Sequence, residues 1–439
     1  MFWFRRGRRV LTIGSVHLDT IALSNSAGQS SVGETEIGSI IHSMGGSAFN
    51  IAANLALHRR GTGKISAVAI YSILPQHSVL TEIITYKINA SGASSRFLSL
   101  YGEFNQRRVR GGGYVGLLDE EQRLIRRAVV DAAMHDANIF AHSEEAANLA
   151  RAINWADMLV LDADLAVPTI DHIAEHARLN SKPLFLSIGS ALAGMRSWLM
   201  SSEVNEADCI GGRSMVIRAL LEHMRMPQDD IAAFRSFVES GNANGRFDIN
   251  EICHQLRTKC LVCSNVRESK GFALLAAGAT PYKCFFATPE SVRHRMQQGN
   301  SAGVVDGALA GFIQAYAEVA ERAEATSAAC IVDDTSRKEF QSSILSFVGH
   351  VSESEGATQG SVISFEEQAS QQSQLAKLWR LTRIAFDMLP VFRFIFSIAA
   401  FIIAYWIIEK SIDLLAYFNV QIPLLDPTYL RTIIQRGRP

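Results

Sequence analysis

The sequence has little net charge and few cysteines for a chain of 439 residues. Its 42 Lys and Arg nearly balance 43 Asp and Glu, and the net charge of -1 argues against a nucleic-acid binder that relies on bulk electrostatics. Six cysteines in so long a chain form no disulfide framework, so we expect reduced thiols in a cytosolic compartment. Cys260-x-x-Cys263 has a zinc-ligand spacing, but it lies in a predicted buried strand, where cysteine serves as a small hydrophobic residue.

Several sequence signals are missing, and each absence excludes a class of protein. No Gly-x-x-x-x-Gly-Lys-Ser/Thr motif occurs, which excludes a P-loop nucleotide site. Gly14 stands alone after the first predicted strand, which disfavours a dinucleotide-binding oxidoreductase. In residues 1–9 the basic residues follow the apolar ones, with no apolar run and cleavage site after them, so we expect no secretory signal there.

One hydrophobic run is long enough to predict a single C-terminal transmembrane helix. Residues 391–408 are 18 residues with a single charge, Arg393, near the start. At 1.5 Å per residue this meets the minimum for a hydrocarbon core of about 30 Å. Tyr405 and Trp406 lie near one end, as interfacial anchors do. A buried core helix is the alternative interpretation.

The flanks of this run predict its surroundings and its orientation. Residues 349–374 are rich in Ser, Gln, Glu and Gly and predict a flexible linker, and residues 409–439 form a short tail. Residues 375–390 form either a basic amphipathic helix on an anionic membrane surface or an extension of the span. Basic residues concentrate on the N-terminal side of the span, so we expect a single-pass membrane protein with its large domain in the cytoplasm.

Residues 10–348 alternate short apolar runs with helical patterns. This alternation predicts an α/β fold, a doubly wound parallel sheet covered by helices on both faces. The predicted strands are Val10–Gly14, Ile65–Ile70, Met158–Asp162, Pro183–Ser187 and Cys260–Cys263. The predicted helices include Ser47–Arg60, Pro168–Leu179 and Asp306–Arg322.

Two polar clusters lie close to the N-terminus. His17 and Asp19 follow the first strand, at the sheet edge where open α/β sheets bind ligands, and Asp19 could accept hydrogen bonds from substrate hydroxyls. Gly45 and Gly46 open a helix with Asn50 one turn in, so a ligand can approach the backbone there. A turn aspartate and an ordinary glycine loop are the structural alternatives.

The third cluster, Gly299–Gly311, leads small residues into a helix. Backbone N–H groups at such a start can hold a phosphate, and the helix dipole favours developing negative charge. Asp306 would lie in the first turn, placed to take a proton from an attacking hydroxyl. The alternative is an aspartate that only caps the helix.

In this order the three clusters resemble the ribokinase (PfkB-type) family of sugar and nucleoside kinases, over about residues 10–335. Within the family, residues 50–56, Asn300, 113–119 and 129–134 look like the pseudouridine kinase branch. The resemblance implies a ribokinase-like fold with a small β lid from segments near 20–40 and 97–120.

The resemblance also implies an activity, which is phosphorylation of a hydroxymethyl group on a sugar or nucleoside with ATP and Mg²⁺, pseudouridine being one candidate. It implies Asp306 as the general base and the Gly303–Asp306 backbone as the anion hole. The implied site residues are Asp306, Gly303, Val304 and Val305 for catalysis; His17, Asp19, Gly45, Gly46 and Asn50 for substrate; and Asn205, Asp208 and Gly271 for nucleotide and magnesium. No metal other than magnesium with ATP is expected.

The departures from the family pattern all fall on the ATP side. Gly-Ala-Gly-Asp is here Gly303-Val304-Val305-Asp306, and the β-branched valines would crowd a phosphate and resist positive φ. Asn-x-x-Glu ends in Asp208, and the nucleotide-side glycine motif matches only at Gly271. The alternative function is therefore a membrane-tethered pseudokinase that senses a ligand or serves as a subunit of a membrane assembly. Its partners would be a homodimer mate or a membrane-complex subunit.

Overall fold

A computed structural model shows two compact units, Met1–Ser364 and Phe365–Pro439. The structure describes residues 7–24, 38–62, 64–104, 107–109, 112–118, 124–130, 138–163, 165–188, 198–201, 206–242, 246–264, 271–290, 292, 303–322, 336–352 and 362–363, all in the first unit. The predicted amphipathic helix, transmembrane helix and tail lie outside these residues. Within the described ranges, no helix has both the length and the apolar character needed to cross a membrane.

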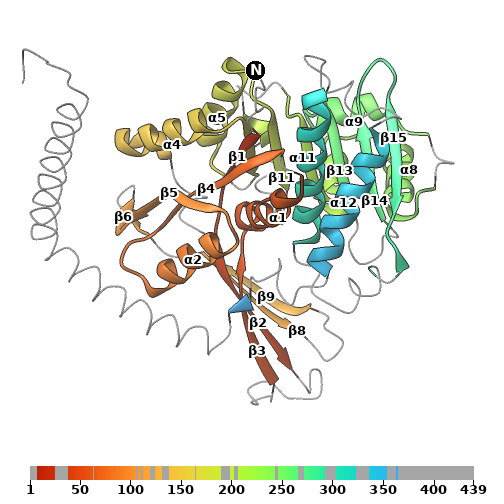
Figure 1. Cartoon of the computed structure of the whole chain (residues 1–439). Coiled ribbons are helices and arrows are strands. Elements are labelled where there is room, and N and C mark those ends of the chain that lie inside the picture. The colour runs from red at the N-terminus through yellow and green to blue at the C-terminus, as the bar shows by residue number, and fades with distance from the viewer. Residues whose placement is uncertain are drawn as a thin grey trace, which may run out of the picture. The chain divides into compact units, whose positions relative to one another are not determined.

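A nine-stranded sheet forms the centre of the first unit (Figure 1), in the order β15-β14-β13-β12-β11-β10-β1-β4-β5. Its parallel strands are β5 (Ser94–Tyr101), β4 (Ile65–Pro75), β1 (Arg8–Ile13), β10 (Met158–Asp162), β11 (Leu184–Ile188), β12 (Cys209–Arg213) and β13 (Cys260–Ser264). The last two, β14 (Gly271–Ala276) and β15 (Tyr282–Ala287), are antiparallel. The expectation of a wholly parallel sheet is thus wrong at this edge, because short connections join β13, β14 and β15 and leave no room for crossover helices.

Helices cover both faces of this sheet, as predicted, and each face has its own hydrophobic core. One core includes residues of α1 (Ser47–Thr62), α2 (Val79–Ala90), α11 (Val304–Arg322) and α12 (Arg337–Ser352). The other includes residues of η1 (Ile139–Ala141), α4 (Ser143–Trp155), α5 (Val167–Leu179), α7 (Ser214–His223), α8 (Gln228–Ser240) and α9 (Ile249–Gln255). Strands buried on both sides explain the continuous apolar runs of the sequence.

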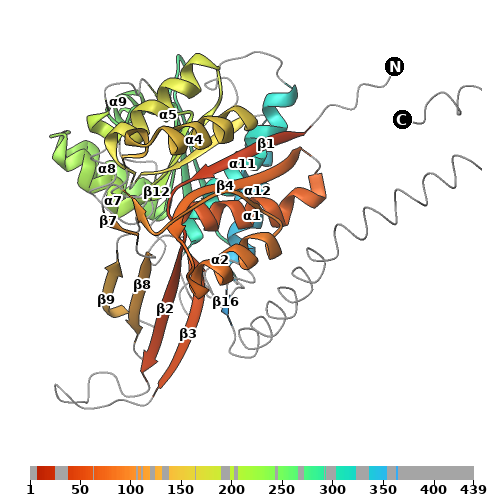
Figure 2. The ribbon, with the colours of Figure 1, turned by 90° about the vertical axis from the view of Figure 1, so that its left-hand side faces the viewer.

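A second, five-stranded sheet projects from the first (Figure 2), in the order β16-β3-β2-β8-β9. Its strands are β2 (His17–Ser24), β3 (Gly38–Gly45), β8 (Gly113–Leu118), β9 (Leu124–Val130) and β16 (Val362–Ile363). β6 (Glu103–Phe104) and β7 (Arg107–Arg108) pair separately. Of the expected lid segments, residues 97–101 lie instead in β5 of the large sheet, and β16 lies within the expected linker. β3 leads through Gly46 into α1, which connects the lid to the large sheet.

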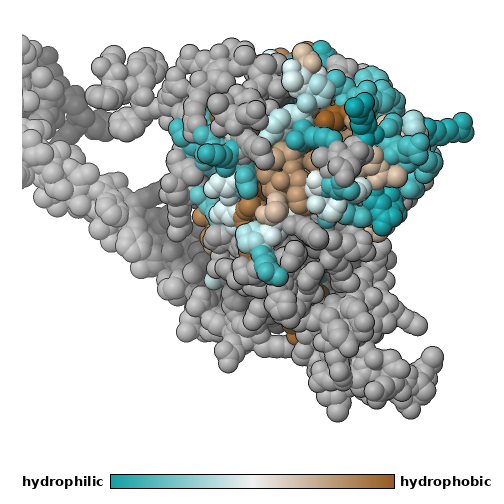
Figure 3. All heavy atoms as spheres, turned by 90° about the vertical axis from the view of Figure 1, so that its right-hand side faces the viewer, coloured by the Kyte–Doolittle hydropathy of each residue, from teal (hydrophilic) through white to brown (hydrophobic). Residues whose placement is uncertain are grey.

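The far edge of the large sheet is protected by a charge. Figure 3 shows that side of the molecule, where hydrophobic residues gather near the centre and hydrophilic residues border them. Lys283 of the edge strand β15 lies 5.0 Å from the ring centroid of Phe247 and 5.4 Å from that of Phe237. A lysine on an edge strand disfavours pairing with the sheet of another molecule.

Candidate active site

Asp306 lies in the first turn of α11, at the carboxyl edge of the large sheet. The turn before it is made by Gly303, which has φ of 80° and accepts a hydrogen bond of 2.7 Å from the backbone N–H of Gly307. Val304 and Val305 are already helical, and their side chains are buried in the core. Positive φ, which β-branched valines resist, is therefore not required of them, because in this turn it falls on Gly303.

The Asp306 carboxylate is held by residues from two other elements. Nδ2 of Asn50 in α1 donates to Oδ2 at 2.9 Å, and the hydroxyl of Ser187 in β11 donates to Oδ1 at 2.8 Å. Asp306 is 6% exposed. Burial raises its pKa, an effect that these two hydrogen bonds oppose, while Asp162 raises it further and Arg213 lowers it. A buried carboxylate with a raised pKa is a stronger proton acceptor than an exposed one.

Asn50 is positioned by the turn that begins α1. Its backbone N–H donates to the carbonyl of Gly46 at 2.9 Å, and its own carbonyl accepts from Asn54 Nδ2 at 2.8 Å. Gly46 has φ of 95°, and a Cβ there would overlap the carbonyl oxygen of Ser15. Glycine is thus required where the chain turns from the lid into α1.

Asp19 lies on β2, and the lack of a side chain on Gly45 of β3 leaves room for its carboxylate. It is 8% exposed and lies opposite Ser43 in the register, while His17 lies opposite Gly45. His17 Nε2 is 3.0 Å from Asp19 Oδ1. A Cβ on Gly45 would overlap the Asp19 carboxylate, so only glycine leaves space at this position.

Three buried polar atoms in this region accept or donate no hydrogen bond within the described part of the chain. They are Asp19 Oδ1, which the imidazole of His17 approaches without hydrogen-bond alignment, Ser43 Oγ and Asn50 Oδ1. Buried polar atoms are otherwise almost always paired. Because β3 and α1 carry Ser43 and Asn50 on one continuous segment, these atoms indicate a site for a polar ligand with several hydroxyl groups.

Sequence reasoning did not identify Asp162, Ser187 or Ser43 as site residues. Asp162 ends β10, where it accepts hydrogen bonds from Ser15 N–H at 3.4 Å and Ser15 Oγ at 3.0 Å. Asp162 and Ser187 each close a buried strand, and a polar residue in that place signals the ligand edge of a parallel sheet. Ser43 lies inside a strand and shows no comparable signal.

Asp208, one of the residues predicted to bind nucleotide and magnesium, does not join this site. Asp208 accepts hydrogen bonds of 2.8 Å from the N–H of Leu184 and from Lys259 Nζ. Leu184 is the first residue of β11, and three residues at about 3.3 Å each separate it from Ser187. Asp208 therefore lies at the amino edge of the sheet, because the match to Asn-x-x-Glu falls before β12 and not after it. Asn205 lies outside the described residues.

Gly271 begins β14 at the carboxyl edge, since β14 runs antiparallel to β13. A Cβ there would overlap the carbonyl oxygen of Phe286, so close packing between strands explains this glycine without a nucleotide. No cluster of three or more metal-binding side chains occurs in the described ranges. The backbone N–H groups at the start of α11 can hold a phosphate group, and Asp208 lies at the opposite edge of the sheet.

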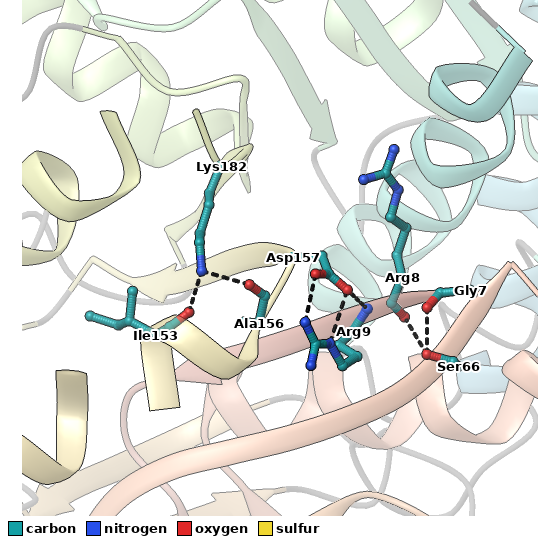
Figure 4. A network of polar contacts seen from close by, with 8 residues as sticks. All are labelled: Gly7, Arg8, Arg9, Ser66, Ile153, Ala156, Asp157 and Lys182. Carbon is teal, nitrogen blue, oxygen red and sulfur yellow. Dashed lines mark hydrogen bonds and ion pairs between the residues drawn. The ribbon is translucent and has the colours of Figure 1, made fainter. Parts of the chain in front are cut away.

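The amino ends of the same parallel strands carry a different polar network (Figure 4), in which charges are paired. Arg9 holds Asp157, the residue before β10, through its backbone N–H at 2.8 Å and through Nη2 at 2.9 Å. Lys182, shortly before β11, donates to the carbonyls of Ile153 at 2.6 Å and Ala156 at 2.7 Å. Both carboxylate oxygens of Asp157 and the ammonium of Lys182 are thus satisfied within the protein, which stabilises the fold.

Glu145 of α4 is a second buried carboxylate, and it too is fully paired. It accepts hydrogen bonds from the hydroxyls of Tyr71, Ser99 and Tyr101 and from Asn148 Nδ2. Burial and the nearby carboxylate raise the pKa of both tyrosines, which keeps them neutral donors. These contacts satisfy both carboxylate oxygens of Glu145 within the structure.

Comparison with solved structures identifies the fold. The ribokinase of Giardia lamblia superposes with a TM-score of 0.58 at 14% identity, covering 84% of this chain and 99% of that one. The fold is ribokinase-like. A carbohydrate kinase from Agrobacterium tumefaciens (TM-score 0.53, 18% identity, 83% and 96% covered) and a nucleoside kinase from Burkholderia thailandensis solved with inosine (0.51, 13%, 82% and 96%) are also similar. No protein-family model matches the sequence, and no curated protein matches it significantly.

Proposed function

We propose that this protein transfers a phosphoryl group to a hydroxymethyl group of a sugar or nucleoside, with Asp306 as general base. The observation that carries the proposal is a buried carboxylate in the first turn of α11, held by Asn50 and Ser187. The acceptor hydroxyl gives its proton to Asp306, and its oxygen bonds to the γ-phosphorus while the bond to the β-phosphate oxygen breaks. The N–H groups at the start of α11 stabilise charge on the transferred group.

The acceptor side supports a ligand with several hydroxyl groups. Asp19 Oδ1, Ser43 Oγ and Asn50 Oδ1 offer two acceptors and a hydroxyl that make no hydrogen bond in the described residues, and the imidazole of His17 lies 3.0 Å from Asp19 Oδ1. Vicinal hydroxyls of a sugar or of a nucleoside ribose fit such a set. The similar solved structures are carbohydrate and nucleoside kinases, which agrees with this choice of acceptor.

ATP and magnesium are proposed as the phosphoryl donor system. The backbone at the start of α11, with Gly303 in its left-handed conformation, would hold the phosphates. Magnesium, when bound, neutralises phosphate charge. With Asp208 tied to Lys259, no step is assigned to magnesium through that residue.

The direct test is ADP release by the full chain with Mg-ATP and a panel of ribose, fructose, adenosine and pseudouridine. Pseudouridine comes first, because residues 50–56 resemble that branch of the family. Turnover on one acceptor that disappears in Asp306→Asn supports the proposal. Turnover that persists in Asp306→Asn would exclude Asp306 as the base.

The second candidate is a ligand-binding protein that does not transfer phosphate. The location of Asp208 at the amino edge favours it, since the expected magnesium acid is absent from the site. Under this hypothesis an acceptor stabilises the protein thermally, while Mg-ATP causes neither a thermal shift nor ADP release. A thermal shift with each ligand in turn discriminates between the two functions.

We also propose that residues 391–408 anchor the protein in a membrane with the kinase-like domain in the cytoplasm. The length of the apolar run and the basic residues before it support this proposal. Carbonate extraction of membranes from cells that express the full chain, compared with a chain ending at residue 374, tests it. Release of both chains by carbonate would contradict the anchor.

A further inference from the structure

Arg213 is a charged residue at the carboxyl edge that neither the proposed transfer step nor the sequence motifs use. It ends β12 and is the residue before α7, with φ of -75° and ψ of 135°. Its Cα pairs with Ser264 at the end of β13. Arg213 therefore lies at the same sheet edge as Asp162 and Ser187, which end β10 and β11.

Strand alternation places the Arg213 side chain on the face that α11 covers. Side chains two residues apart in a strand share a face. Cys209 belongs to the core beneath α11, and a Cβ on Gly211 would meet Leu309 Cβ of α11 at 2.8 Å. Arg213 is the next residue of this series.

Distances along the two elements bring Arg213 level with the first turn of α11. Two strand residues beyond Gly211 advance the chain by about 6.6 Å toward the carboxyl edge. Four helix residues from Leu309 back to Val305 cover about 6 Å in the same direction. The guanidinium also lowers the pKa of Asp306, which agrees with a position close to that carboxylate.

The surroundings of Arg213 favour negative charge. The N-terminus of α11 and that of α7 both begin at this edge, and both favour negative charge. A guanidinium between them matches the geometry of phosphate oxygens.

We propose that Arg213 contacts the phosphates of the donor and supplies there a fixed cation that lets polyphosphate bind without a divalent metal. The inference rests on the proposed function, since it assigns the donor half of the same site. It also explains how the site can hold phosphates although Asp208 lies at the opposite edge. The bound ligand class is a linear polyphosphate, free or at the end of a nucleotide.

The test measures binding of inorganic tripolyphosphate to the full chain in excess EDTA, by calorimetry. The wild type is expected to bind, Arg213→Ala to bind at least tenfold more weakly, and Arg213→Lys to fall between them because it keeps the charge without the fork. Arg235→Ala is the matched control, since Arg235 pairs with Glu239 on the surface of α8. Equal affinity in the wild type and Arg213→Ala would overturn the inference, and so would binding that requires magnesium.

Asp306→Asn separates this inference from the proposed function. Its tripolyphosphate affinity is expected to equal or exceed that of the wild type, because a negative neighbour is removed, while ADP release is lost. If the wild type releases no ADP with any acceptor but binds tripolyphosphate through Arg213, phosphotransfer fails and the phosphate site stands. If Arg213→Ala does not fold, the ratio between Arg213→Lys and wild type decides, and equal affinities would contradict the proposed contact.

Discussion

The two edges of the nine-stranded sheet treat buried polar groups in opposite ways. At the amino edge, Asp157 is bound by Arg9 and Asp208 by Lys259, with contacts of 2.8–2.9 Å. At the carboxyl edge, Ser43 Oγ and Asn50 Oδ1 make no hydrogen bond in the described residues, and Asp19 Oδ1 has only the imidazole of His17 at 3.0 Å. Paired charges stabilise a fold, whereas buried atoms without partners cost free energy until a ligand satisfies them. The comparison supports the proposed ligand site at the carboxyl edge without reference to any motif.

The largest expected difference is in kcat, between an Asp→Asn substitution at the carboxyl edge and one at the amino edge. Asp306→Asn removes the proposed base and should lower kcat by about 10²–10⁴-fold. Asp157→Asn should leave kcat within about twofold, because Asp157 lies in the saturated network of the amino edge. Steady-state ADP release measures both. Comparable losses in the two variants would show that the edges do not differ in function.

The next effect concerns the space beside Asp19. Gly45→Ala places a methyl group on the carboxylate, and the loss of a charged hydrogen bond to the acceptor should cost about 1.5–3 kcal/mol, or roughly 10–100-fold in kcat/KM for the acceptor. The KM for ATP should not change. Gly102→Ala is the control, since its Cβ would come no nearer than 4.0 Å to another atom, Gln76 Oε1. An unchanged kcat/KM for the acceptor in Gly45→Ala would show that Asp19 does not bind the acceptor.

A smaller effect is expected on stability at the amino edge. Asp157→Asn should lower the free energy of unfolding by about 1–2 kcal/mol, because the pair with Arg9 is partly exposed. Burial would raise the pKa of Asp157, but the hydrogen bonds from Arg9 outweigh it and hold that pKa below the ordinary value of 3.8. The stabilisation is therefore complete above about pH 4 and is lost as the pH falls through the lowered pKa. Urea unfolding at several pH values tests both the size and the direction.

The smallest expected effect is a gain in stability, in contrast to the loss in Asp157→Asn, and it concerns Asp306. Its pKa is raised by burial, so its charged form destabilises the folded state at neutral pH. Asp306→Asn should melt slightly above the wild type at pH 7, and this gain should disappear as the pH falls below the ordinary carboxyl pKa. The gain is small because Asn50 and Ser187 compensate part of the burial cost. A gain that grows toward acid pH would contradict a raised pKa.

The sequence predicted the parallel part of the large sheet from general rules, and the family resemblance assigned Asn50 and Asp306 to one site, although their direct hydrogen bond was not predicted. Buried parallel strands are continuous apolar runs, and polar residues at helix starts gather at their carboxyl edge. That rule joins two residues 256 positions apart in the chain. Val304 and Val305 replace the alanine and glycine of the family pattern without backbone strain. In the turn before α11 the left-handed conformation falls on Gly303.

The remaining site residues could not be predicted for identifiable reasons. Asp208 matched a motif by its letters, but whether it precedes or follows β12 decides which sheet edge it reaches. Arg213 is the residue that does reach the carboxyl edge, and only the strand register reveals it. Ser43 lies opposite Asp19 because β2 pairs with β3. The sequence between these two strands carries no pattern from which that pairing could be predicted.

The short strand β16 has a consequence for how the lid meets other molecules. Val362 and Ile363 pair antiparallel with Ser43 and His42, so the outer side of β3 is occupied next to the acceptor residues. An open strand edge is a template for addition of a strand from another chain. The chain thus covers the part of the β3 edge beside Ser43 with a segment more than 300 residues downstream, and strand addition from another chain is blocked at that point of the lid sheet.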